Sequence, residues 1–159
     1  MKIAIFLGLK FVIITTYAVS LLASASENNN AEITKPIKQL FAAMRSHSSE
    51  QLLAQFTANA MLQRIQPNGE VIQSDLNGFA ESIAKSTKYL DEKLLKIETH
   101  QQGNMASVWT PFAFYLDKKL SHCGVNSFQL VKTDLGWKIH YLIDNTYPGD
   151  CNAFIARFN

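Results

Sequence analysis

The sequence lacks an excess of charge of either sign. It holds 15 lysine and arginine residues against 13 aspartate and glutamate residues. Lys2 and Lys10 belong to an N-terminal targeting segment, and without them the basic and acidic residues balance at 13 each. Proteins that bind DNA or RNA carry a basic patch, because phosphate contacts supply much of their affinity. The balance therefore argues against a nucleic-acid partner.

The chain also lacks the local motifs of several enzyme classes. It has no G-x-S-x-G turn, no phosphate-binding loop and no glycine-rich cradle. Asp91 and Glu92 are sequence neighbours on a segment that we expect to face water, which argues against a carboxylate-pair hydrolase. Four histidines show no metal-ligand spacing: His47, His100, His122 and His140. The sequence predicts neither a metal site nor a cofactor.

Residues 1–25 have the parts of a secretory signal peptide. Lys2 and Lys10 give a basic start, an apolar core runs to residue 22, and an A-x-A cleavage site ends at Ala25. Cleavage there leaves residues 26–31 as a polar lead-in. An uncleaved anchor stays open, because Ile3–Ala25 is long enough to span a bilayer. We expect an exported protein, periplasmic or secreted, that meets the membrane only through this segment.

Cysteine is scarce, with Cys123 and Cys151 alone in the chain. An even count in an exported protein favours a disulfide between them. A buried thiol or a reactive nucleophile at Cys123 is the alternative. His122 is adjacent, but neighbouring side chains on a strand point to opposite faces, which argues against a Cys–His pair. The two cysteines therefore predict a structural bridge.

Residues 32–159 are long enough for one domain and contain no repeat, low-complexity segment or linker. Apolar residues recur with helical spacing over Glu32–Ser46. A second short helix is predicted over Glu50–Phe56, and Asp75 is a plausible N-cap for a third that ends at Lys85. The first half of the domain is thus mainly helical.

Strand patterns interrupt and follow these helices. Ala60–Ile65 and Val71-Ile72 flank a Pro-Asn-Gly turn and predict a short hairpin. Leu94–His100 alternates between apolar and polar residues, as a half-exposed strand does. The order of helices and strands predicts an α+β fold with the helices packed on one face of a sheet.

Three apolar runs close the chain with only short turns between them, which predicts an antiparallel meander. They are Met105–Leu116, Leu120–Thr133 and Trp137–Tyr147. The first is apolar on both faces, with Trp109 and Tyr115 on the face opposite Val108, Phe112 and Phe114. A strand that faces water on neither side must be covered on both, so we expect helices on one face and a partner or another element on the other.

This order of elements resembles the nuclear transport factor 2-like superfamily, which includes ketosteroid isomerase, scytalone dehydratase and SnoaL-type cyclases. The segments Ala106-Ser107-Val108-Trp109, Ser121-His122-Cys123-Gly124 and Gly136-Trp137-Lys138-Ile139 look like an exported subgroup that is often labelled lumazine-binding. The resemblance implies a cystatin-like α+β barrel, in which a strongly curved antiparallel sheet wraps around a long helix. It also implies a pocket at the wide end and dimerisation through the outer face of the sheet. It transfers no catalytic residue, because superfamily enzymes place these at scattered cavity positions.

Candidate site residues lie on the last strands. Asp144 and His122 are the catalytic candidates, and Trp109, Tyr115, Asn126 and His140 are the ligand-binding candidates. A three-residue loop at Asp134-Leu135-Gly136 would place Asn126 opposite Asp144, with His140 on the same face. A two-residue loop at Leu135-Gly136 would place Asn126 opposite Asn145 instead, and a bulge at Gly124 would reverse everything before it.

Two functions from different classes remain open. The favoured one is an exported module that binds a small apolar or aromatic ligand, or serves as a dimeric scaffold, without catalysis. The alternative is a small lyase or isomerase of the ketosteroid-isomerase type. In that enzyme a desolvated Asp144 would move a proton while His122 positions the substrate. Fold resemblance alone does not choose between them.

Overall fold

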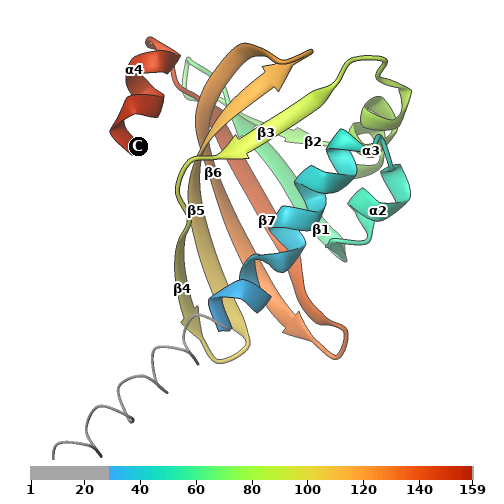
Figure 1. Ribbon diagram of the computed structural model, residues 1–159. Coiled ribbons are helices and arrows are strands. Elements are labelled where there is room, and N and C mark those ends of the chain that lie inside the picture. The colour runs from blue at the N-terminus through green and yellow to red at the C-terminus, as the bar shows by residue number, and fades with distance from the viewer. Residues whose placement is uncertain (1–28, 159) are drawn as a thin grey trace, which may run out of the picture.

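The computed structural model describes residues 29–158 (Figure 1). The predicted signal peptide, residues 1–25, and the first half of the lead-in lie outside this range. Residues 29–31, the rest of the lead-in, belong to the N-terminal helix, which is described over 29–45. Within the described residues no helix is long and apolar enough to cross a membrane.

Two short helices follow the N-terminal helix, and side chains cap both. α2 (Ser49–Leu53) begins after Ser48, whose hydroxyl accepts a hydrogen bond from the Gln51 amide. α3 (Leu76–Lys85) begins after Asp75, as predicted, and the Asp75 carboxylate accepts from the Gly78 amide at 2.8 Å. α2 is shorter than predicted, because Phe56 already begins the first strand.

The sheet has seven strands in the order β2-β1-β7-β6-β5-β3, with β4 also paired to β5. The prediction of N-terminal helices on a curved sheet is confirmed, but the sheet is mixed because β1 runs parallel to β7. The strands are β1 (Phe56–Ile65), β2 (Val71–Ser74), β3 (Leu90–Leu94), β4 (Glu98–Gln102), β5 (Met105–Leu116), β6 (Lys119–Thr133) and β7 (Gly136–Thr146).

The predicted strand Leu94–His100 is in fact split between β3 and β4, and β3 begins at Leu90. Both short strands pair with β5, β3 near one end of it and β4 near the other. Pro111 lies between these two paired regions and has no backbone N–H to offer a neighbouring strand. Its carbonyl accepts from Leu95 at 2.8 Å, and the ladder stops there until Glu98.

The β5–β6 hairpin has a two-residue turn at Asp117-Lys118. Both residues have positive φ angles, 49° and 66°, as a type I′ turn requires. Beyond this turn Tyr115 pairs with Leu120, but the next residue, Phe114, pairs with His122. Ser121 is therefore the extra residue of a bulge in β6. The predicted bulge at Gly124 is not there, because that residue pairs regularly with Phe112.

Gly124 is instead required by a close approach of two strands. A Cβ at this position would lie 1.9 Å from the backbone carbonyl oxygen of Asn145. No side chain fits in that space, so the tight curvature of β6 against β7 depends on glycine here.

The core lies between the concave face of the sheet and the helices (Figure 1). The N-terminal helix crosses that face and buries Ile33, Ile37 and Leu40 against residues such as Phe128 and Ile139. On the other face, α4 (Cys151–Ile155) is joined to β6 by the predicted disulfide between Cys123 and Cys151. The rest of that convex face carries side chains of β1, β5, β6 and β7.

Candidate functional site

A cavity of about 330 Å³ lies between the N-terminal helix, α3 and the concave face of the sheet. Most of its wall is apolar, which suits a ligand with an apolar body. The apolar lining residues are Leu40, Phe41, Met44, Leu62, Ile72, Phe79, Ile83, Leu90, Phe114 and Leu142. Phe41, Phe79 and Phe114 line this volume without filling it, so the two ligand hypotheses keep their physical basis.

Strand register brings Asn126 and Asp144 to the same place on the cavity wall. The loop between β6 and β7 has two residues, since Thr133 pairs with Gly136. This matches neither predicted loop. A bulge at His140 then shifts the register by one residue, and Asn126 lies opposite Asp144, as the three-residue loop would have placed it.

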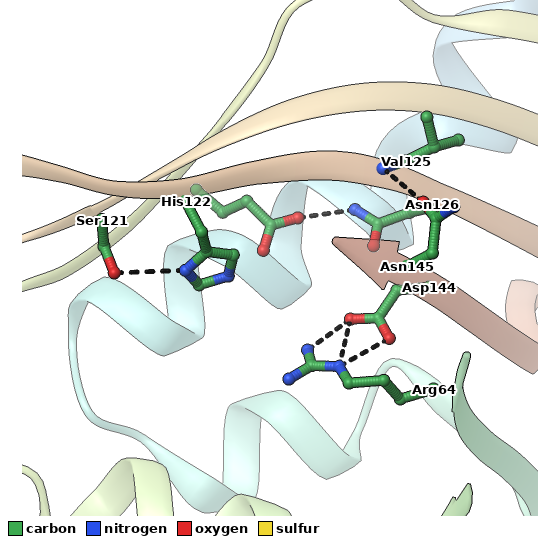
Figure 2. A network of polar contacts seen from close by, with 8 residues as sticks. Arg64, Ser121, His122, Val125, Asn126, Asp144 and Asn145 are labelled. Carbon is green, nitrogen blue, oxygen red and sulfur yellow. Dashed lines mark hydrogen bonds and ion pairs between the residues drawn. The ribbon is translucent and has the colours of Figure 1, made fainter. Parts of the chain in front are cut away.

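Asp144 is held by an arginine that the sequence reading did not include. Arg64 on β1 lies beside Asp144 on β7 in the parallel pair, and both side chains point into the cavity. The Arg64 Nε donates to the two carboxylate oxygens at 2.9 and 3.2 Å, and Nη2 donates to Oδ2 as well (Figure 2). The Asp144 side chain is 13% exposed and that of Arg64 is 50% exposed. Asp144 is thus committed to an ion pair at the cavity edge.

Glu92 is the second residue that sequence reading missed as a site residue. The prediction that it faces water is wrong, because its side chain lines the cavity from β3. Its Oε1 accepts a hydrogen bond of 2.6 Å from the Nδ2 of Asn126, which is itself buried. Asp91, its neighbour, forms a separate ion pair with Arg45 at 3.2 Å. The two adjacent acids therefore have different partners.

Burial raises the pKa of Glu92 to about 8, and the negative charge of Asp144 adds to the rise. The Asn126 hydrogen bond and the positive charge of Arg64 oppose it. At neutral pH the carboxyl of Glu92 is therefore mostly protonated. One oxygen accepts from Asn126, so the proton on the other makes Glu92 a neutral hydrogen-bond donor in an apolar cavity.

His122 also lines the cavity and lies beside this group on β6. Its Nδ1 lies 3.2 Å from the Ser121 hydroxyl (Figure 2). Burial lowers the pKa of His122 below its ordinary value, and the charge of Arg64 lowers it further while Asp144 opposes the shift. The imidazole is neutral at pH 7, so one of its ring nitrogens can accept a proton.

The six candidates from the sequence do not all meet. Asp144, His122 and Asn126 line the cavity together. Trp109 and Tyr115 lie on the convex face, where Lys93 stands 4.7 Å from the centre of the Tyr115 ring. His140 is the bulged residue of β7, and its Nδ1 lies 2.9 Å from the hydroxyl of Thr57 outside the cavity.

The arrangement can bind and can exchange protons. A neutral acid, a neutral imidazole and an ion pair converge on one cavity whose remaining wall is apolar. Within residues 29–158 there is no group of three or more histidine, cysteine, aspartate or glutamate side chains that could hold a metal ion. The chemistry that these residues themselves offer is hydrogen bonding and proton transfer.

Comparison with known proteins gives the fold. No family model matches the sequence, and no curated protein matches it either. Solved structures do match. A protein of unknown function from Mycobacterium tuberculosis has a TM-score of 0.68 and 15% identity, covering 82% of this chain and 78% of that one.

Two further structures carry the name of the fold. A proposed dehydratase of the NTF2-like family from Streptomyces avermitilis has a TM-score of 0.66 at 14% identity, covering 78% of this chain and 99% of that one. An NTF2-like protein with a cystatin-like fold from Novosphingobium aromaticivorans has a TM-score of 0.64 at 13% identity, covering 87% and 94%. This chain has the NTF2-like, cystatin-like fold.

Proposed function

We propose that this chain is an exported protein that binds a small molecule in the cavity above the concave face of its sheet. The observation that carries the proposal is the half-buried Glu92, a neutral hydrogen-bond donor with a pKa of about 8, at the polar end of an apolar cavity. The apolar side chains around this donor limit its hydration, so a ligand oxygen that accepts its hydrogen bond would stabilise the complex.

The size and the lining of the cavity indicate the chemical class of the ligand. About 330 Å³ is at the small end of the range for ligand sites, so it suits a compact molecule of one or two rings. The apolar lining selects an apolar or aromatic body, and Glu92 selects a carbonyl or hydroxyl oxygen on it. An anionic group would meet Asp144 and is disfavoured near it, although Arg64 lies at the same edge.

The first test is native mass spectrometry of the full chain purified from an exporting host, which detects a molecule that co-purifies. Binding is then measured by calorimetry with a panel of neutral aromatic ketones and phenols and with lumazine. We expect a panel ketone or phenol to bind, and Phe114→Ala in the cavity wall to weaken it, while Phe158→Ala on the C-terminal segment leaves it unchanged. Absence of any co-purifying or panel ligand would count against the proposal.

A second candidate is a lyase or isomerase that moves a proton on such a molecule. The specific observation in its favour is that Glu92 and the neutral His122 share the cavity, one holding a proton at pH 7 and the other able to accept one. Glu92 replaces Asp144 as the proposed acid, since Asp144 is bound by Arg64. The proposed dehydratase from Streptomyces avermitilis has the same fold, which makes this chemistry possible for the fold.

Glu92→Gln separates the two candidates. Glutamine keeps the oxygen that accepts from Asn126 and keeps a donor toward the cavity, but it has no transferable proton. A binding protein retains its ligand affinity in this variant. An enzyme retains affinity and loses turnover by at least about a hundredfold, the usual size of a general-acid contribution. Glu81→Gln on the exposed side of α3 is the control for both measurements.

Export and dimerisation are parts of the same proposal. A mature N-terminus near Ser26 in protein recovered from the periplasm or medium supports export, and an unprocessed Met1 does not. The convex face offers Met61, Trp109 and Ile143 to a second copy, with Met61 and Trp109 exposed by 41% and 39%. Sedimentation of the parent protein should then give a dimer, and Trp109→Glu should dissociate it. A monomeric parent protein would refute dimerisation through this face.

A further inference from the structure

One end of the molecule combines exposed apolar side chains with lysines. This hairpin end consists of the β4–β5 turn, the β6–β7 turn and the first residues of the N-terminal helix, 29–35 (Figure 1). Leu135, in the β6–β7 turn, is 87% exposed and is the most exposed large apolar side chain of the described residues. Met105, beside the β4–β5 turn, is 57% exposed. Neither side chain is needed by the core.

The two turns that carry these side chains are in contact. The Lys132 amide at the end of β6 donates to the carbonyl of Asn104 in the β4–β5 turn at 2.8 Å, and Met105 pairs with Val131. The N-terminal helix reaches the same place, because Asn29 donates a side-chain hydrogen bond to Gln101 on β4. The two turns and the start of the helix thus lie side by side.

Lysines surround the exposed leucine. Lys35, Lys132 and Lys138 border, with Leu135, one surface hollow of about 340 Å³ between the N-terminal helix and the β6–β7 turn. Lys138 is turned toward the carbonyl of Ala54. Glu32 in the hollow and Asp134 in the turn are the acids nearby, so the three lysines leave this surface with a small positive excess.

We propose that the hairpin end docks on the surface of a bilayer that contains anionic lipids. Leu135 and Met105 would enter the boundary between headgroups and acyl chains, while Lys35 and Lys132 contact lipid phosphates.

The orientation leaves the ligand cavity open to solvent. β7 begins with Gly136 at the hairpin end, and Asp144 at the cavity edge lies near its other end. Docking therefore would not cover Arg64 or Asp144. The inference stands apart from the proposed function, because it uses other residues and survives if no ligand is found.

The test places single tryptophans at the two ends of the full chain. Leu135→Trp lies in the β6–β7 turn, and Leu116→Trp, at a position 36% exposed beside the β5–β6 turn, is its matched control. Each is mixed with vesicles of phosphatidylethanolamine and phosphatidylglycerol with brominated acyl chains, and its emission is compared with that of the parent protein. Every variant keeps Trp109 and Trp137, so the quantity compared is the quenching beyond that of the parent protein. We expect this additional bromine quenching for Leu135→Trp only, and none with vesicles of phosphatidylcholine alone.

Charge reversal tests the lysines. Lys132→Glu should lower the partition coefficient onto these vesicles by at least about fivefold, the size expected for one cation near an anionic surface. Lys119→Glu at the opposite end should leave it unchanged. The N-terminal segment is the same in every variant, so it cannot produce these differences. The proposal is overturned if Leu116→Trp is quenched as strongly, if neutral vesicles bind as well, or if Leu135→Trp changes only the oligomeric state.

Discussion

The raised pKa of Glu92 predicts how the stability of this fold depends on pH. The ordinary glutamate pKa of 4.5 applies to the unfolded chain, whereas the folded pKa is about 8. Between these values the folded protein holds a proton that the unfolded chain has released. Folded protein therefore binds more protons, and the free energy of unfolding falls as pH rises through this window. The stability associated with the neutral acid is fully present below pH 4.5.

The magnitude follows from the width of the window. Each pH unit changes the free energy of unfolding by about 1.4 kcal/mol for one proton. Below pH 6.5 the lowered pKa of His122 has the opposite effect on stability. At this residue the folded protein binds fewer protons than the unfolded chain, so its contribution to stability rises with pH. Glu92 therefore dominates the pH dependence between pH 6.5 and 8. Over this interval we expect the free energy of unfolding to fall by about 2 kcal/mol.

Urea denaturation of the full chain at half-unit intervals from pH 6.5 to 9 measures this loss. Glu92→Gln should flatten the profile and be more stable than the parent protein at pH 8, because it retains the contact with Asn126 and cannot ionise. Glu81→Gln, exposed on α3, should keep the parent slope. A parent profile that is flat over this interval, or a Glu92→Gln profile with the parent slope, would refute the reasoning.

Three further variants test other parts of the structure. Asp144→Asn should lower the free energy of unfolding by about 1 kcal/mol, because Arg64 is half exposed and keeps its hydration; a double-mutant cycle with Arg64→Met measures the pair, and a coupling near zero would contradict it. Replacing Cys123 and Cys151 by alanine should cost about 3–4 kcal/mol by the chain-entropy model for a separation of 28 residues. Peptide mapping without reductant should recover the bridge, and free thiols would exclude it. Gly124→Ala should cost more than about 3 kcal/mol in thermal denaturation, since its Cβ meets a backbone carbonyl at 1.9 Å; a melting point like that of the parent would mean the strands can separate there.

The sequence predicted the layers of the fold because its apolar periods are regular. Helical spacing in the first half and alternation in the last third predicted helices on one face of a sheet, whereas the curvature of the sheet was implied only by the family resemblance. Asp75 caps the helix that it was expected to cap. The parallel pairing of β1 with β7 was not predictable in this way. Alternation shows which side chains share a face of a strand, but it does not state which strand lies next to it.

Register shows the limit of turn counting. The turn after Thr133 is one residue shorter than the loop that puts Asn126 opposite Asp144. The two residues still meet, because the bulge at His140 restores the register. No residue type marks this bulge in advance. The three-residue loop would have placed His140 on the same face as Asp144, but His140 lies outside the cavity, next to Thr57.

Glu92 differs from His140, because the sequence does contain a pattern that predicts its place in the cavity. Leu90, Glu92 and Leu94 alternate along β3 and share the face on which both leucines contact the core. An acid in phase with two leucines reads as inward-facing, whereas Asp91 is out of phase. Two adjacent acids suggested a segment that faces water, whereas the alternation of Leu90, Glu92 and Leu94 predicts that Glu92 faces the core.

The stability that the protein loses when Glu92 ionises is also the strongest physical reason to look for a function at this residue. A glutamine at this position makes the same contact with Asn126 and lacks the loss of stability that ionisation brings between pH 6.5 and 8. An acid that lowers stability where a neutral isostere would not is a departure from what folding alone requires, and such departures concentrate at functional sites. Glu92→Gln should therefore gain stability at pH 8 and keep its ligand affinity, because glutamine retains a donor toward the cavity. If the protein is an enzyme, the same variant should lose turnover, and a variant that keeps turnover would exclude Glu92 as the general acid.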